Sequence, residues 1–278
     1  MSPSIDAAAL LDIAVAAARE AAALITRERV AATEDSVHVA PVATKSSATD
    51  VVTAVDTAAE ESIARRLLAA RPEDGLLGEE GAGRSGSSGV RWVVDPIDGT
   101  VNFLYGLPAY AVSIAAEVAG AVLAGVVLNV VTGEEYTATR GGGAWLGGRP
   151  GQDPVRLRGS APASLEQTLV ATGFGYRAEQ RRRQGAVVAA LLPLVRDIRR
   201  HGSSALDLCT AAAGRVDAYY ELDLQPWDHA AGALVAQEAG LVVTGLPGRA
   251  FADPLAVAVA PSVAEPFLAL LTRLHGDG

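Results

Sequence analysis

An apolar strand that ends in two carboxylates constrains the fold of this chain more than any other feature. Residues 92–94 (Trp-Val-Val) carry no charge, and residues 95–100 (Asp-Pro-Ile-Asp-Gly-Thr) follow them directly. We expect the apolar run to be a strand that presents Asp95 and Asp98 at its carboxyl end. The intervening proline restrains the turn, Gly99 allows a ligand to approach the backbone, and a helical turn after it would direct N–H groups towards an anion. By itself, the segment fits either a cation and phosphate site or a solvated turn.

Further acids lie in two other segments. Glu79 and Glu80 follow two leucines and a glycine, and adjacent residues on extended backbone point to opposite sides, so only one of them is expected to enter a site. Asp228 lies at the start of a predicted helix, in the sequence Trp-Asp-His-Ala-Ala-Gly at 227–232. The ordinary alternatives are a surface pair for the glutamates and a helix cap for the aspartate. A structural role is favoured for His229, because no His-x-x-x-His or Cys-x-x-Cys pattern accompanies it.

The chemistry of these acids favours a metal site. Carboxylate oxygens are hard ligands, and without soft ligands nearby they favour Mg²⁺ over zinc. Gathered in one pocket, they would repel one another and raise their pKa values unless cations were bound. The nucleophile would then be a metal-activated water, since the chain lacks Gly-x-Ser-x-Gly, a Walker A motif and a Cys/His pair. The glycine pattern at 81–86 does not predict dinucleotide binding, because it leads into a strand.

Composition limits the classes of protein to which the chain can belong. It has 278 residues, of which 50% are hydrophobic, so a large core is expected. We expect a single unit over 1–278, with an α+β first half, an α/β second half and a soft seam near 147–162. The net charge of −9 argues against nucleic-acid binding. Cys209 is the only cysteine, which predicts a reducing, cytoplasmic location, and charges within residues 6–29 exclude a signal peptide core. No membrane span is expected.

Hydrophobic periodicity predicts an alternation of helices and strands. The expected helices are 6–29, 53–70, 178–196, 203–213, 227–239 and the C-terminal end. The expected strands are 110–118, 121–131, 135–139, 168–172, 217–221, 241–244 and 256–260. Residues 33–50, 81–89 and 141–151 are expected to be loops.

Together, these motifs resemble the inositol monophosphatase family over most of the chain. The matching segments are 45–47, 50–56, 78–80, 92–103, 202–205, 217–221 and 227–232. The resemblance implies an α/β fold, the layered α-β-α-β-α sandwich of that family. It also implies a phosphoric monoester hydrolase that acts with Mg²⁺ on inositol monophosphate or a related sugar or polyol phosphate.

The resemblance further implies ligands for two to three Mg²⁺ ions. Glu79, Asp95 and the carbonyl of Ile97 would hold the first ion. Asp95, Asp98 and Asp228 would hold the second, which would stabilise the leaving alkoxide, while Glu79 would face a third ion through water. A carboxylate that bridges two cations agrees with an in-line attack, in which both the entering and the leaving oxygen need charge neutralisation.

Other residues match positions used in catalysis and substrate binding. Thr100 and Glu79 would orient the attacking water, and the backbone at Gly99 and Thr100 would bind the phosphate. Glu221 and Ser204 match positions that contact substrate hydroxyls, although several relatives have Ala in place of this serine. The remaining matches are Asp56, an acid behind the metal ligands, and Lys45, in a mobile active-site loop.

Three functions stay open from the sequence. The first is hydrolysis of inositol monophosphate, which Glu221 favours; the second is hydrolysis of another small monoester, such as histidinol phosphate, fructose bisphosphate or a 3′-phosphonucleotide. The third is a binding protein that acts on the transcription machinery or RNA, supported only by the arginine run 181–183, for which a solvated helix face is the simpler account. The expected partners are a phosphate monoester and a second copy of the chain, and the resemblance to a lithium-inhibited family predicts inhibition by Li⁺.

Overall fold

The computed structural model describes residues 5–32, 39, 43–44, 51–148 and 151–276. The helices are α1 (Ala7–Ala32), α2 (Ala54–Ala70), α3 (Thr100–Tyr105), α4 (Ala178–Leu191), α5 (Ser204–Ala212), α6 (Pro226–Glu238) and α7 (Ala264–Gly276). The first strands are β1 (Ala43–Thr44), β2 (Val51–Val52), β3 (Gly75–Gly78), β4 (Gly83–Arg84), β5 (Val90–Asp98), β6 (Ala111–Val118), β7 (Ala121–Asn129) and β8 (Glu135–Thr139). The later strands are β9 (Gly143–Gly147), β10 (Val155–Arg156), β11 (Leu169–Thr172), β12 (Asp197–Arg199), β13 (Ala218–Leu222), β14 (Val242–Thr244) and β15 (Leu255–Val259).

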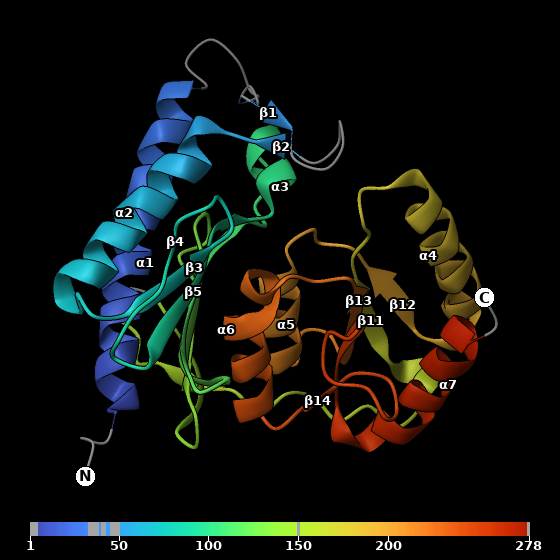
Figure 1. The fold of residues 1–278 in the computed structure, drawn as a ribbon. Helices are drawn as coiled ribbons and strands as arrows, with labels where there is room; N and C mark the ends of the chain where they lie inside the picture. Colours follow the sequence, from blue (N-terminus) through green and yellow to red (C-terminus); the bar gives the residue numbers. More distant parts are fainter. Residues whose placement is uncertain (1–4, 33–38, 40–42, 45–50, 149–150, 277–278) are drawn as a thin grey trace.

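These elements stack in five layers, which Figure 1 shows from one side to the other. Helices α1 and α2 cover the outer face of a first sheet, α5 and α6 lie between the two sheets, and α4 and α7 cover the outer face of the second sheet. The predicted α-β-α-β-α sandwich is therefore confirmed. No helix among the described residues is both long and apolar enough to cross a membrane.

The first sheet has the strand order β10-β9-β8-β7-β6-β5-β3-β4. Its strands β5 to β10 are antiparallel neighbours, while β3 runs parallel to β5. Both faces of β5 are buried: Trp92 and Val94 pack on the side of α1 and α2, and Val93 packs on the side of α5 and α6. Residues 92–94 of β5 are thus buried and apolar, as the sequence predicted, whereas Arg91 before them is exposed and pairs with Glu117.

Small residues allow the helices of the middle layer to pack closely. A Cβ atom on Gly232 of α6 would lie 3.0 Å from Leu208 on α5, and a Cβ atom on Gly125 of β7 would lie 3.0 Å from Ala231. Contacts this short are tighter than most Cβ contacts, so a methyl group at either position would push its neighbour away, and the glycines allow the close packing of α6 against α5 and the first sheet. The middle layer in turn carries the starts of both helices towards the carboxyl end of β5.

The structure corrects several of the sequence predictions. The 141–151 connection contains β9, whose Ala144 is fully buried, so tertiary packing overrides the flexibility of the flanking glycines. The loop at 81–89 contains β4, which pairs with the edge of β3. The helix expected at 178–196 ends at Leu191, because Pro193 lies in a short 3₁₀ turn (Leu192–Leu194) and the chain then enters β12, a strand that the sequence did not predict. The division into two halves with a seam near 147–162 stays a prediction.

Candidate active site

A cavity of 630 Å³ gathers most of the residues that the sequence predicts for the site. Its walls include the end of β5, the starts of α3, α5 and α6, and the end of β13. The predicted residues that line it are Glu79, Asp95, Ile97, Asp98, Gly99, Thr100, Ser204, Glu221 and Asp228. Asp56 lies behind this wall, and Lys45 lies outside the described residues. A larger hollow of 1080 Å³ beside α4 and α7 contains none of the predicted site residues.

The corner between β5 and α3 fixes the first carboxylate. Asp95 is 1% exposed, and its Oδ1 atom accepts a hydrogen bond of 3.0 Å from the backbone N–H of Ile97. Gly99 caps α3 with a φ of 95°, a left-handed conformation that costs other residues free energy. A Cβ atom on Gly99 would also lie 2.8 Å from the carbonyl oxygen of Ala109. Glycine is therefore needed at this corner for both its conformation and its size.

Asp98 links the end of β5 to the start of α5. Its Oδ2 atom accepts hydrogen bonds from the hydroxyl of Ser203 at 2.6 Å and from the backbone N–H of Ala205 at 2.7 Å, both at the start of α5. A second hydrogen bond joins α3 to the residues before α5, because the side chain of Asn102 donates to the carbonyl of His201 at 2.7 Å. The orientation of this carboxylate thus depends on how α5 packs against β5.

Asp228 takes part in a helix cap and also lines the cavity. It lies in the first turn of α6, where its Oδ2 atom accepts the backbone N–H of Gln225 at 2.7 Å in a capping box. The same carboxyl group lines the cavity and is close enough to Asp98 to raise its own pKa. Its neighbour His229 packs against Phe251 with ring centroids 5.2 Å apart, and burial lowers the pKa of this histidine to about 4. The neutral ring supports the structural role expected for it.

The two adjacent glutamates separate as predicted. Glu79 lines the cavity, and its carboxyl group contacts that of Asp95, whereas Glu80 is not part of the lining. The charge of Glu79 and this contact both help to raise the pKa of Asp95.

Raised pKa values distinguish this cavity from the rest of the surface. The pKa of Asp95 is well above its usual value because of burial and the charges of Glu79, Asp98 and Asp228. Burial raises the pKa of Asp98 to about 7, and burial and the charge of Asp98 raise that of Asp228. In the absence of cations, the cavity therefore holds protons that a carboxylate in water would release.

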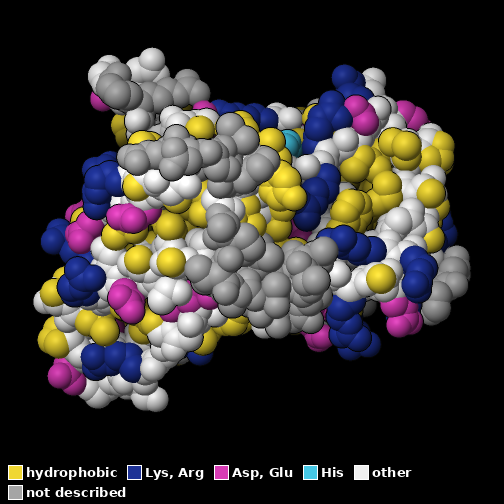
Figure 2. Space-filling view, turned by 90° about the horizontal axis from the view of Figure 1, so that it is seen from above, with side chains coloured by type: hydrophobic (Ala, Val, Ile, Leu, Met, Phe, Trp, Pro, Cys, Tyr) yellow, Lys and Arg dark blue, Asp and Glu magenta, His cyan; other side chains and the backbone are white. Residues whose placement is uncertain are grey.

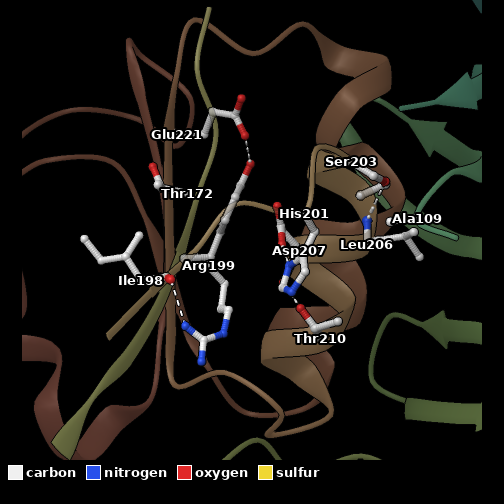
Figure 3. Close-up of polar contacts among 12 residues, drawn as sticks. Ala109, Thr172, Ile198, Arg199, His201, Ser203, Leu206, Asp207, Thr210 and Glu221 are labelled. Carbon is white, nitrogen blue, oxygen red and sulfur yellow. Dashed lines mark hydrogen bonds and ion pairs between the residues drawn. The ribbon is translucent and has the colours of Figure 1, made fainter. Parts of the chain in front are cut away.

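Glu221 lies on the other side of the cavity, at the end of β13. Its Oε2 atom accepts a hydrogen bond of 2.8 Å from the hydroxyl of Tyr219, and burial raises its pKa to about 8. A Cβ atom on Gly173 would lie 2.0 Å from the carboxyl atoms, so this glycine leaves the space that the acid occupies. Figure 3 shows Glu221 above the pair formed by His201 and the buried Asp207 of α5.

Asp56 of α2 reaches the cavity wall through Thr100. The hydroxyl of Thr100 lies 3.2 Å from Oδ1 of Asp56 and 3.1 Å from the carbonyl oxygen of Ile97, so it has an acceptor on either side. Asp56 is 1% exposed, and its Oδ2 atom accepts the backbone N–H of Thr53 at 2.8 Å. Asp56 therefore lies behind the cavity lining, which it contacts through Thr100.

The donor set fits Mg²⁺, although the carboxylates do not form a preformed cage. Within the described part of the chain, no group of three or more His, Cys, Asp and Glu side chains has the arrangement that holds a metal ion. The four acids predicted as metal ligands, Glu79, Asp95, Asp98 and Asp228, nevertheless line one cavity and offer oxygen ligands, and the repulsion between their charges favours a divalent cation among them. Binding would draw the carboxylates together around the ion.

Some residues of the cavity were not found from the sequence. Gly173, Tyr176 and Gln180 also line it, on the side of α4. Arg200 lines it too, and its charge lowers the pKa of Glu221 against the larger effect of burial. No local pattern in the sequence identifies these residues.

Comparisons with known proteins agree with this geometry. The sequence profile of the inositol monophosphatase family matches residues 6–275. The inositol-1-monophosphatase of Mycobacterium bovis is 50% identical over 238 residues, which cover 84% of this chain and 81% of the relative. The Nus factor SuhB of Escherichia coli is 42% identical over 241 residues, or 86% of each chain. Among solved structures, Mycobacterium tuberculosis SuhB matches with a TM-score of 0.81 at 44% identity, over 98% of both chains.

The chain belongs to the inositol monophosphatase family. It is a phosphomonoester hydrolase, so the family and the class of enzyme predicted from the motifs are both confirmed.

Proposed function

We propose that this protein hydrolyses inositol monophosphate, or a closely related sugar or polyol phosphate, with Mg²⁺ as its cofactor. The observation that carries the proposal is the convergence of Glu79, Asp95, Asp98 and Asp228 on one cavity, where the charges of their neighbours raise the pKa values of Asp95 and Asp228. Bound divalent cations relieve this repulsion and are attracted by it. Similarity to a relative named inositol-1-monophosphatase supports the choice of substrate.

We assign the ligands of two to three Mg²⁺ ions to the acids of the cavity. Glu79, Asp95 and the carbonyl of Ile97 would hold one ion, and Asp95, Asp98 and Asp228 another. When bound, the cations neutralise the phosphate, activate the attacking water and stabilise the leaving oxygen. The protein contributes the fixed orientation of Asp95 and Asp98, whose oxygens accept backbone N–H groups at 3.0 and 2.7 Å.

Thr100 and Glu79 would hold the attacking water. When the hydroxyl of Thr100 donates to Asp56, its lone pairs accept a hydrogen from the water. The carboxylate of Glu79 accepts the second hydrogen and can take the proton as the new P–O bond forms. The backbone at Gly99 and Thr100 would bind the phosphate oxygens.

Ser204 and Glu221 would bind the polyol. The hydroxyl of Ser204 donates to the carbonyl of Asp228 at 3.0 Å, so its lone pairs are left to accept a substrate hydroxyl. Glu221, oriented by Tyr219, would accept another.

Metal removal tests the proposal. Protein stripped with a chelator should not hydrolyse inositol 1-phosphate, and added MgCl₂ should restore turnover. Since the cavity holds protons without cations, Mg²⁺ binding near pH 7 should also release protons into an unbuffered solution. Full activity after rigorous chelation would contradict the metal assignment. Preference for another phosphate monoester would contradict only the choice of substrate.

A second candidate function is a binding role in transcription, because the E. coli relative is named a Nus factor. The arginine run 181–183 gives it little support: Arg183 pairs with Glu179 at 2.6 Å, and Arg181 donates to the carbonyl of Gly175. On the face seen in Figure 2, basic side chains are interspersed with acidic and hydrophobic ones. If the variant Asp228→Asn lost turnover yet still bound RNA polymerase or its RNA, the protein would have both roles.

We also propose a homodimer in a reducing compartment, the cytoplasm. The proposal rests on the family resemblance and on the free, buried thiol of Cys209. Light scattering of the purified protein measures the assembly directly.

A further inference from the structure

A buried glutamate outside the cavity holds the loop that carries Glu79. Glu60 lies on α2 and is 3% exposed. Its Oε2 atom accepts the backbone N–H of Glu80 at 2.9 Å, and its Oε1 atom accepts that of Ala82 at 2.7 Å. Each oxygen of one carboxylate therefore binds a different backbone group, on the C-terminal side of Glu79.

The same loop is held on its other side. The N–H of Gly78 donates to the carbonyl of Ala82 at 2.8 Å, and the N–H of Glu79 donates to the carbonyl of Val94 at 3.2 Å. A Cβ atom on Gly78 would lie 2.1 Å from Oε2 of Glu60, so the chain passes directly against the carboxylate at a residue without a side chain. The backbone around Glu79 is thus fixed to β5 and to α2 at once.

Helix α2 carries a second acid, Asp56, which also contacts the wall of the cavity. Asp56 lies four residues before Glu60, so the two side chains project from the same face of the helix. Asp56 contacts the hydroxyl of Thr100, while Glu60 binds the loop of Glu79. One rigid helix face therefore supports both groups that would orient the attacking water.

We propose that Glu60 is a positioning residue for the reaction: its carboxylate sets the place of Glu79 relative to Thr100 and Asp95. The inference rests on the proposed function, in which Glu79 binds a cation and holds the water. Small displacements of reacting groups have large effects, since about 1 Å of misplacement can cost about 10²-fold in rate. The competing explanation is that Glu60 stabilises the fold only.

The substitution Glu60→Gln separates these explanations. The amide keeps one acceptor atom and places an NH₂ donor against the other backbone N–H, so one of the two bonds is lost without a change in size. We expect kcat for inositol 1-phosphate to fall about 10- to 100-fold, the Mg²⁺ concentration for half-maximal rate to rise, and KM for the substrate to change less than about threefold. The control is Glu61→Gln, an exposed acid next along the helix, which should leave all three unchanged.

A measurement without metal or turnover completes the test. In chelator, the amides of Glu80 and Ala82 should exchange hydrogen faster in Glu60→Gln than in the wild type, while those of β6 stay unchanged. If exchange is faster but kcat and Mg²⁺ dependence stay at wild-type values, Glu60 does not position Glu79 for the reaction. If exchange is unchanged, Glu60 does not hold the loop of Glu79 at all. Should Glu60→Gln not fold, Glu60→Asp, which is too short to reach both N–H groups, takes its place. Failure of both to fold would favour the purely structural role.

The failure of this inference differs from the failure of the proposed function. If the wild-type protein with Mg²⁺ hydrolyses no phosphate monoester, the proposed function is wrong, and the positioning role of Glu60 is then wrong as well. Wild-type turnover together with an unaffected Glu60→Gln variant overturns the role of Glu60 alone.

Discussion

Replacing Asp98 by Asn should make the protein without metal more stable and the enzyme inactive. Asp98 is 8% exposed, and burial raises its pKa from 3.8 to about 7. Above pH 7 the folded chain therefore holds a buried negative charge that no cation neutralises. An Asn Oδ1 atom can still accept the hydroxyl of Ser203 and the N–H of Ala205, so the geometry should survive the change.

The sign and size of the effect follow from the shifted pKa. Because the folded state binds this proton more tightly than the unfolded state, the free energy of unfolding of the wild type falls as pH rises from 3.8 to about 7. The two pH units between 5 and 7 correspond to about 3 kcal/mol. The variant lacks this titration but also loses charge-assisted hydrogen bonds that contribute on the order of 1–2 kcal/mol. At pH 8 we therefore expect it to be about 1–2 kcal/mol more stable than the wild type.

Urea unfolding in chelator, at pH 5 and at pH 8, measures this difference for both proteins. The advantage of the Asp98→Asn variant should grow by about 3 kcal/mol between the two pH values. Added Mg²⁺ should reverse the order at pH 8, because it binds the folded wild type and not the variant. A difference that does not change with pH would refute the reasoning, since Asp98 would then titrate alike in the folded and unfolded chains.

Three further predictions concern the same cavity. Asp228→Asn should lower turnover of inositol 1-phosphate by several orders of magnitude while circular dichroism stays unchanged, because the leaving oxygen loses its cation; near-normal turnover would remove this residue from the metal site. Li⁺ should inhibit in assays where NaCl of equal concentration does not, and equal rates in the two salts would contradict a second metal site of the family type. Glu221→Gln should lower kcat/KM for inositol 1-phosphate about 10- to 100-fold, the loss expected for one charged hydrogen bond of about 1.5–3 kcal/mol. p-Nitrophenyl phosphate, which has no ring hydroxyls, should be affected far less, and equal losses on both substrates would reject the contact with the polyol.

The position of the site between the layers explains why its acids have such unusual properties. Asp98 is bonded to the start of α5, and Asp228 lies in the first turn of α6, so both depend on the middle layer of the sandwich. Burial in this layer removes water from the carboxyl groups and strengthens their repulsion. The same packing that stabilises the fold therefore raises the pKa values of the carboxyl groups in the cavity.

Local patterns were sufficient to predict most of the elements and the principal acids. The apolar run before Asp95 predicted a buried strand, and the structure has it in β5. Strands β6, β7 and β8 lie where alternation and turn glycines placed them, with Gly120 at a φ of 80° between the first two. These strands and turns depend on residues that are close together in the sequence, so local patterns are enough to predict them.

The sequence by itself determined which residues are candidates for the chemistry: acids at the end of an apolar strand and at the start of a helix, next to glycines that permit close approach. The tertiary structure alone decided which of them meet and how strongly they interact. In the sequence, Glu60 cannot be told from any other acid of a helix. In the structure it accepts the backbone N–H of Glu80, twenty residues further along the chain, and so holds the loop of Glu79. In the sequence, Gly173 likewise cannot be told from any other loop glycine, yet in the structure the space beside it is occupied by the carboxyl group of Glu221. Burial and pKa depend on distances in space, and those are set only when the helices pack between the sheets.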